Sequence, residues 1–169
     1  MAKNGSAYIS TSTDYTSTTP STSYYVARFK DGKWDEAGSF KLPKITDLVR
    51  AEAISTDGNT LIYATTATYE ATTYDIYTVD ISKKGNTAKK ITSYTIPATG
   101  EGAMAYPMLS AAFTNNNANV LVGYGVNVDN KRYATKNDYY YVINIDVEKG
   151  NIAKKWKITG EYGGFLVSN

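Results

Sequence analysis

The chain of 169 residues carries a net charge of +2, from 18 Lys and Arg against 16 Asp and Glu. It is long enough for one domain with a core of its own, and its balanced charge predicts neither nucleic acid nor an anionic membrane surface as a partner. The sequence has no His and no Cys, which excludes metalloprotease, Ser-His-Asp, Cys-His and zinc-deaminase sites. Carboxylate, Tyr or Lys chemistry is not excluded by this composition; we nevertheless expect no catalytic residues, no metal and no cofactor.

The composition and the start of the chain indicate an exported bacterial protein. There are 16 Tyr against 4 Phe, with abundant Thr, Ser and Asn, as in bacterial surface proteins. The first residues lack the apolar run of a signal peptide, and no stretch reaches the ~18 apolar residues of a membrane helix. We expect a location at the cell surface or in the periplasm, with a signal or lipid anchor removed upstream of the abrupt start.

Residues 1–43 predict the first of three similar β units. A turn at residues 4–6 leads into a strand at residues 7–10, and a further strand at residues 24–29 ends in the tight turn of Asp31 and Gly32. Gly, Asn and Asp suit the positive φ that hairpin turns need. No strand precedes the first turn, so this unit starts with the second strand of the pattern that the later units show in full.

Residues 49–97 and 107–159 carry that full pattern of four strands. An apolar strand meets an Asp, Asn and Gly turn, a β-branched and aromatic strand follows, and a third strand alternates with period two. A Lys-Gly-Asn turn, centred on Gly85 in one unit and on Gly150 in the other, leads into the fourth strand. The fourth strand is the most polar, so we expect it at the outer edge. Residues 44–53 are the one stretch that suits a short helical turn.

The fourth strands also carry basic pairs and tryptophans. We expect the pairs Lys89-Lys90 and Lys154-Lys155 to protect the outer sheet edges from aggregation. Trp34 and Trp156 fall at fourth-strand positions, where we expect them to pack against neighbouring residues.

Four-stranded units that repeat every ~40–60 residues predict one all-β domain, residues 1–169, built from β-propeller blades. A β-sandwich made of similar hairpins is the alternative. Residues 164–169 match the first-strand pattern of residues 51–56, so we expect residues 160–169 to supply the first strand of a further blade or of the N-terminal one. Because a closed ring has roughly four to eight blades, three arrangements remain open: two copies that complete one ring, a piece of a longer propeller, or an unusually small ring.

Residues 54–63 and 77–85 carry a family resemblance. They read Ile-Ser-Thr-Asp-Gly-Asn-Thr-Leu-Ile-Tyr and Tyr-Thr-Val-Asp-Ile-Ser-Lys-Lys-Gly, and they resemble the repeat of YVTN-like bacterial β-propellers. This resemblance spans most of the chain and implies the fold, but no particular ligand. In its Tyr, Thr and Lys content the chain also resembles surface propeller lipoproteins of gut Bacteroidetes, in a domain-of-unknown-function family. Some members of that family are implicated in capturing iron–siderophore complexes for an outer-membrane transporter, which implies a function of that kind without assigning a residue.

The units differ most in the links after their second and fourth strands. In a four-stranded blade these links share one face, and the turns after the first and third strands share the other. The longer links are residues 11–23, 41–48, 66–73, 98–106, 126–137 and 160–162. Extra length on one face of a rigid repeat is typical of a binding surface, although tolerant surface loops would show the same pattern.

The long links carry the side chains that we expect to bind a ligand. The candidate residues are Tyr15, Tyr69, Tyr106, Lys131, Arg132, Tyr133, Tyr162 and, at the opening of a first strand near the mouth of any channel, Arg50. Flat rings with polar tips and forked cations suit an anionic, partly aromatic small molecule such as an iron–siderophore complex, or a partner protein. Solvation alone is the alternative for the single loop tyrosines, and Arg50 could simply pair with Asp47 or Glu52.

The sequence therefore predicts a non-enzymatic binding module. One alternative is a self-assembling propeller fragment that has no ligand of its own and forms a homodimer through its open edges. A more distant alternative is a carbohydrate-active propeller, which needs two carboxylates facing each other in the channel. Nothing in the spacing of Glu52, Glu101 and Glu161 brings these carboxylates together.

Overall fold

The computed structural model describes residues 7–14, 21–68, 71–95, 104–114, 119–127 and 139–159. Within these ranges the chain forms eleven strands and no helix, which confirms the predicted all-β class. The short helical turn expected within residues 44–53 is wrong, because an extended strand occupies the second half of this stretch. Val49 and Ile54 both pack into the core from that strand, which a helical turn would not allow.

The strands form three antiparallel sheets, and within each sheet the strands follow one another in chain order. The N-terminal sheet holds β1 (Ala7–Asp14), β2 (Ser21–Lys30) and β3 (Lys33–Lys41). The middle sheet holds β4 (Leu48–Ile54), β5 (Thr60–Thr66), β6 (Thr73–Asp80) and β7 (Lys89–Thr95). The C-terminal sheet holds β8 (Met104–Thr114), β9 (Asn119–Asn127), β10 (Tyr139–Asp146) and β11 (Asn151–Thr159).

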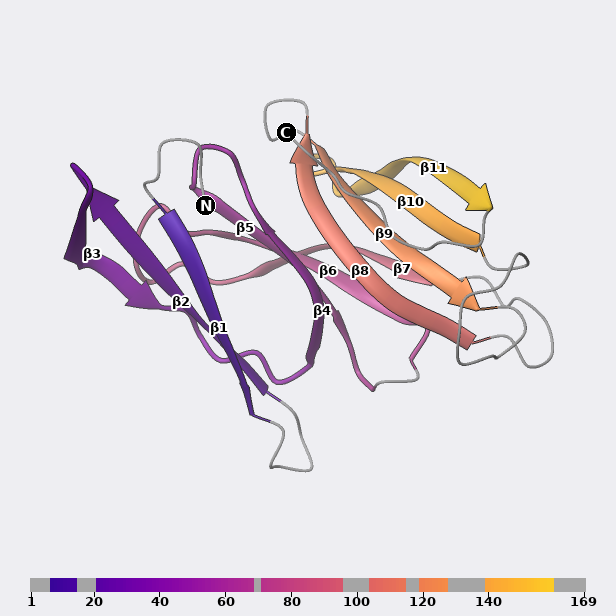
Figure 1. The fold of residues 1–169 in the computed structure, drawn as a ribbon, viewed down its shortest axis with the longest axis horizontal. Coiled ribbons are helices and arrows are strands. Elements are labelled where there is room, and N and C mark those ends of the chain that lie inside the picture. Colours follow the sequence, from indigo (N-terminus) through magenta and orange to yellow (C-terminus); the bar gives the residue numbers. More distant parts are fainter. Residues whose placement is uncertain are drawn as a thin grey trace.

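The sheets are arranged like successive blades. The first strands of the two four-stranded sheets, β4 and β8, lie beside each other, and so do their last strands, β7 and β11 (Figure 1). The N-terminal sheet has three strands among the described residues, and residues 1–6 lie outside them, so the absence of its first strand stays a prediction. The last strand of each sheet is an outer edge, as its polar sequence predicts.

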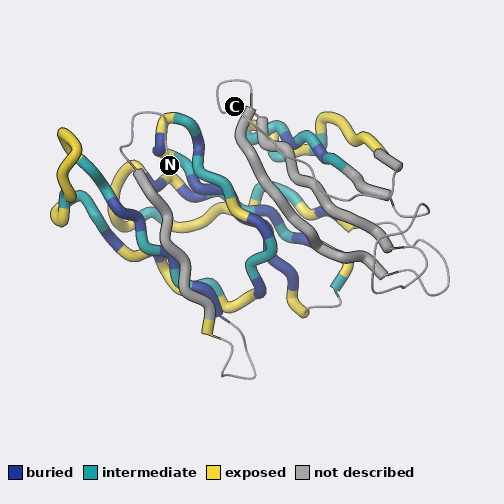
Figure 2. The backbone as a smooth tube through the Cα atoms, viewed as in Figure 1, coloured by how far each residue is buried: buried dark blue, intermediate teal, exposed yellow. Residues whose placement is uncertain are grey.

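The middle sheet is buried on both faces. All six residues from Leu61 to Thr66 of β5 are buried (Figure 2). Leu61 and Tyr63 pack with residues of the N-terminal sheet, whereas Ile62 and Ala64 pack with Ile145 of the C-terminal sheet. Alternate side chains of a strand point to opposite faces, so this run requires a sheet against each face. Three stacked layers match propeller blades and do not match the alternative of a two-sheet sandwich.

Arg28 ties the N-terminal sheet to two turns of the middle sheet. Its guanidinium donates one hydrogen bond to the carbonyl oxygen of Gly58, at 3.1 Å, and another to the carbonyl oxygen of Ile81. Gly58 follows β4 and Ile81 follows β6, so a single side chain holds both short turns of the middle sheet against its neighbour. Burial lowers the pKa of Arg28 and the charge of Asp80 opposes that effect.

Aspartates at the ends of the third strands hold the turns that follow. The carboxylate of Asp80 accepts a hydrogen bond from the amide of Ser82 at 2.8 Å, and that of Asp146 accepts one from the amide of Lys149 at 2.9 Å. These bonds lower the pKa of both carboxyl groups. Gly150, at φ +67°, approaches the next sheet so closely that an added Cβ would lie 2.5 Å from the carbonyl oxygen of Ile91, and only glycine fits there.

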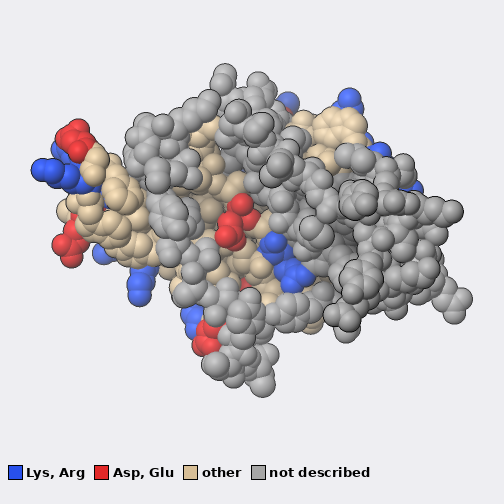
Figure 3. Space-filling model, in the orientation of Figure 1, with Lys and Arg blue, Asp and Glu red and all other residues tan. Residues whose placement is uncertain are grey.

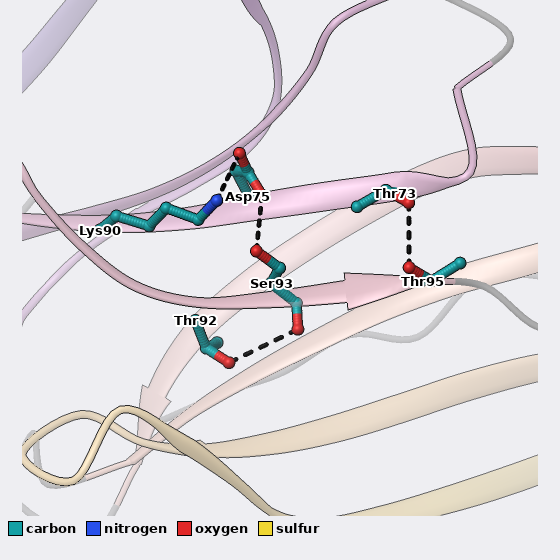
Figure 4. Close-up of polar contacts among 6 residues, drawn as sticks. All are labelled: Thr73, Asp75, Lys90, Thr92, Ser93 and Thr95. Atoms are coloured by element: carbon teal, nitrogen blue, oxygen red, sulfur yellow. Dashed lines mark hydrogen bonds and ion pairs between the residues drawn. The ribbon is translucent and has the colours of Figure 1, made fainter.

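Polar contacts join the outer strand of the middle sheet to its neighbour. On β6 and β7, the carboxylate of Asp75 binds the ammonium of Lys90 at 2.7 Å and accepts a hydrogen bond from the hydroxyl of Ser93 at 2.7 Å (Figure 4). Two residues from the pair of Asp75 and Ser93, Thr73 and Thr95 join their hydroxyls at 2.9 Å (Figure 4). Polar and charged side chains on an outer strand are typical of edges that avoid pairing with another chain.

The tryptophans of the outer strands contact neighbouring side chains, as expected, but both remain exposed. Trp34 on β3 is 51% exposed and Trp156 on β11 is 37% exposed. Each lies on the face of its sheet that is turned away from the middle sheet. Trp34 pairs with Phe29, and Arg28, the neighbour of Phe29 along β2, faces the middle sheet. Trp156 pairs with Val142, and Ile143, the neighbour of Val142 along β10, faces the middle sheet and is buried. No described sheet covers either face.

We predict that Arg28→Met lowers the free energy of unfolding by about 2 kcal/mol, because two carbonyl groups lose a charged donor at a partly buried contact. Urea unfolding measures the change as a shift of the midpoint at constant slope. Lys30→Met, at an exposed position of the same strand, is the matched control and should change stability by less than about 0.5 kcal/mol. Equal effects of the two substitutions would contradict the assigned role of Arg28.

Candidate functional site

The described turns and links divide between the two ends of the sheets. The turn between β4 and β5 and the loop between β6 and β7 lie at one end, where Arg28 contacts both. The turn at Gly150 lies at the same end, against the start of β7. The strands β1, β5 and β9 therefore end, and β4 and β8 begin, at the opposite end of the sheets, here called the long-link end. Of the candidate ligand residues, Arg50 and Tyr106 fall among the described residues, each two residues from the start of its strand, β4 or β8, at this end.

Arg50 occupies a break in the innermost strand of the middle sheet. Val49 pairs with Thr65 and Ala51 pairs with Ala64, so Arg50 has no partner residue on β5. Such a bulge bends the strand and redirects the side chain, and bulges are frequent beside functional sites. The prediction that Arg50 lies near the start of a first strand at the long-link end agrees with this position, but the bulge itself has no signal in the sequence.

The innermost strand of the C-terminal sheet is irregular at the same level. Tyr106 of β8 pairs with Gly125, and the next regular pair joins Ser110 to Gly123. Three residues of β8 thus stand opposite one residue of β9. Because β4 and β8 lie beside each other, the structure brings the backbone positions of Arg50 and Tyr106 to neighbouring inner strands at the long-link end (Figure 1).

The charge of Arg50 acts on a buried tyrosine of the same sheet. Burial raises the pKa of Tyr74, and the positive charge of Arg50 opposes this rise. Arg50 is half-buried and already has an interaction partner within the chain. A guanidinium has five N–H donors, so it can keep a protein partner and still bind an anion.

Glu52, two residues farther along β4, accepts a hydrogen bond from the N-terminal sheet. The hydroxyl of Tyr24, which is fully buried, donates to the carboxylate of Glu52 at 2.9 Å. Burial is the main reason why the pKa of Tyr24 is strongly raised, and the adjacent carboxylate adds to it. Tyr24 therefore stays a neutral donor, and it holds Glu52 on the side of the N-terminal sheet.

Two further tyrosines extend this contact into the middle sheet. The ring of Tyr63 stacks on that of Tyr24 with centroids 6.0 Å apart, and on that of Tyr77 with centroids 5.3 Å apart. Burial raises the pKa of Tyr63 to about 12, with smaller effects from Tyr77 and Asp47. The pairing of Tyr24 with Glu52 was not predicted from the sequence, because it joins residues from two different units.

Buried hydroxyls add polar groups at the long-link end. Ser21 begins β2 and Thr66 ends β5, and the hydroxyl oxygens of both are buried without a hydrogen-bond partner. Residues of this kind are common in β-strands, so the sequence offers no signal for them. On the face drawn in Figure 3, acidic and basic side chains lie next to one another near the middle, where β4 runs in Figure 1.

The other predicted site residues cannot be placed. Outside the described residues lie Tyr15, Tyr69, Lys131, Arg132, Tyr133 and Tyr162, together with Glu101, Glu161 and the predicted closing strand at residues 160–169. For Tyr106 only the backbone is described. Within the described ranges, no three His, Cys, Asp or Glu side chains gather in a way that could hold a metal ion. The described part of the chain also contains no helix of the length and apolarity needed to cross a membrane.

We predict that alkaline pH destabilises the protein through its buried tyrosines. Above the ordinary tyrosine pKa of 10.0 the unfolded chain loses a proton that folded Tyr63 keeps up to about 12. The unfolded state then binds fewer protons, so the free energy of unfolding falls as pH rises through this window. Urea midpoints measured across the window should fall less steeply for Tyr63→Phe. Ile62→Val, on the other face of β5, should lower stability at every pH and leave the slope unchanged; an identical slope in Tyr63→Phe would refute the assignment.

No protein-family model matches the sequence, and no curated protein matches it. The structure does match solved structures. An acylaminoacyl peptidase of Pyrococcus horikoshii, in an orthorhombic crystal form, matches 90% of this chain over 23% of its own length, with 14% identity and a TM-score of 0.54. An acylaminoacyl peptidase in complex with Z-Gly-Gly-Phe-chloromethyl ketone matches 90% of this chain over 23% of its own, with 15% identity and a TM-score of 0.51.

A hypothetical selenium-binding protein from Sulfolobus tokodaii matches 83% of this chain over 36% of its own, with a TM-score of 0.43, which is too low to carry an argument. The chain spans about a quarter of the length of the two peptidases. At these identities the likeness concerns the fold and not the activity. The chain is thus an all-β protein of β-propeller-like fold.

Proposed function

We propose that this protein is a non-enzymatic binding module that holds a small anionic, partly aromatic molecule at the long-link end of its inner strands. One observation carries the proposal, namely the position of Arg50 at the bulge of β4, beside the irregular stretch of β8. Inner strands at the mouth of a propeller are where side chains of several blades converge. A guanidinium at that level offers a forked set of donors to a carboxylate, phosphate or catecholate oxygen pair.

The surroundings of Arg50 suit the rest of such a ligand. In the sequence, the long links contain tyrosines, whose rings have flat apolar faces and polar tips, and Ser21 and Thr66 place buried hydroxyls at the long-link end of the described strands. The carboxylate of Glu52 is already engaged by the hydroxyl of Tyr24. This contact gives Glu52 a structural role, which favours binding over glycoside hydrolysis.

The resemblance to surface propeller lipoproteins supports the finer form of the proposal. It suggests an iron–siderophore complex as the ligand, a location at the cell surface or in the periplasm, and an outer-membrane transporter as partner. These points depend on composition and not on geometry. Substitution of Arg50 therefore tests directly only the anionic aromatic character of the ligand.

The test is calorimetric titration with the iron(III) complex of catechol, an anionic aromatic chelate. Wild-type protein should bind it, and Arg50→Gln should weaken binding by about tenfold or more, because the paired donors and the charge are both lost. Arg50→Lys should give an intermediate loss, because it keeps the charge and loses the fork. Lys84→Gln changes the same net charge on an exposed loop at the opposite end and should bind like wild type.

Two results would contradict the proposal. The first is a wild-type protein that does not bind the chelate, and the second is equal weakening by Arg50→Gln and Lys84→Gln, which would mean a general effect of net charge. Urea unfolding of each variant separates a lost contact from a lost fold, because Arg50→Gln is expected to unfold as cooperatively as wild type.

A further inference from the structure

Two outer sheet faces carry exposed aromatic side chains. On the N-terminal sheet, Trp34 stacks on Tyr25 with ring centroids 5.9 Å apart and meets Phe29 edge-on at 5.7 Å. These three rings lie on the face turned away from the middle sheet, because Tyr24 and Val26, their neighbours along β2, pack into the core on the other side. Trp34 is 51% exposed, an unusual state for a clustered tryptophan.

The C-terminal sheet has a corresponding face. Trp156 pairs with Val142 across β10 and β11, while Ile143 and Ile145 point to the middle sheet and are buried. Val142 is only half-buried and Trp156 is 37% exposed. The ammonium of Lys154 lies over the Trp156 ring, 5.1 Å from its centroid.

The middle sheet shows what these faces look like when they are covered. On its side toward the N-terminal sheet, Val79 is 3% exposed, and on its side toward the C-terminal sheet, Ile76 is 1% exposed. Both lie on β6, the third strand of the blade, as Phe29 lies on β2 and Val142 on β10. The half-buried side chains of the outer sheets therefore stand at the kind of position that a neighbouring blade normally covers.

We propose that the two outer faces are the two halves of one blade-to-blade interface formed between two copies of this chain. The C-terminal sheet of one copy packs on the N-terminal sheet of the other, and the same contact repeats once to close a ring. Three sheets from each copy give a ring of about six blades, within the range of roughly four to eight blades in known propellers.

Continuity with the two interfaces inside the chain favours a second copy as the partner. Each internal interface joins the face of one sheet that is turned toward the following sheet to the face of that following sheet that is turned back toward it. The uncovered face of the C-terminal sheet corresponds to the first kind of face, and that of the N-terminal sheet corresponds to the second. A contact between them repeats the internal geometry, and it closes into a dimer instead of growing into a filament when the rotation completes a ring. Lys155 already joins the C-terminal to the middle sheet by contacting the ring of Tyr94 at 5.7 Å, so cation–aromatic contacts between outer strands occur within the chain.

The open edge of β1 supports the same partner. In the other two sheets the strands that correspond to β1 are β5 and β9, and they pair with the first strands β4 and β8. β1 has no described strand at the corresponding edge. In sequence, residues 164–169 carry the first-strand pattern, so the second copy contains a segment suited to this edge. Strand addition to an open edge supplies main-chain hydrogen bonds along its length.

Light scattering on a sizing column tests the proposal without any ligand, so its outcome is independent of the proposed binding function. The expected particle has twice the chain mass of 18.5 kDa. Trp34→Asp and Trp156→Asp should each raise the dimer dissociation constant about tenfold or more, because each places a charge at the centre of an apolar contact. Lys84→Asp, on an exposed loop away from both faces, should leave the mass unchanged.

A mixing experiment guards against variants that only misfold. In a mixture of Trp34→Asp and Trp156→Asp chains, one of the two contacts of a mixed dimer joins two unaltered faces, so dimers should form again at concentrations where each variant alone is monomeric. A wild-type monomer, an open polymer, or a mixture that stays monomeric while each variant folds would overturn the proposal.

Discussion

The strand at the centre of the middle sheet, β5, has no face in contact with water, and the rest of the described structure is arranged to keep it so. Its six buried residues point alternately to the N-terminal and the C-terminal sheet. Burying a side chain such as Leu61 or Ile62 contributes roughly 1.5–3 kcal/mol, and this gain is lost on one side whenever a neighbouring sheet moves away. Each blade is therefore stable only when it is packed against the next one, as in other repeat architectures.

The two ends of the sheets have different roles in the structure. At the short-turn end, Arg28, Asp80 and Asp146 satisfy carbonyl and amide groups where strands turn back, and Gly150 lets one turn touch the next sheet. Regular contacts of this kind fix the spacing of the blades. At the long-link end the inner strands depart from regular pairing at Arg50 and after Tyr106. A site at the end where the strands depart from the repeat can differ from blade to blade without disturbing the core.

The contact between Tyr24 and Glu52 links the core to this end. A buried phenol cannot ionise easily, so it remains a donor, and the carboxylate of Glu52 is the acceptor that keeps its hydroxyl satisfied. The pair fixes β4 against the N-terminal sheet on one side of the strand, while Arg50 influences Tyr74 in the middle sheet. Opposite charges two residues apart on the inner strand thus act on tyrosines of two different sheets.

The sequence by itself determined the all-β class, the four-stranded unit and the outer position of the polar fourth strands, because period-two alternation and Gly or Asn turns are local properties of a strand and its hairpins. It also indicated which end carries the long links and that Arg50 lies there. Only the tertiary structure decided which strand is buried on both faces, that Arg50 stands at a bulge, and that Tyr24 binds Glu52 across two units. It also showed that Trp34 and Trp156 are exposed, because burial depends on whether another sheet lies against a face, and no pattern within one strand records the presence of that neighbour.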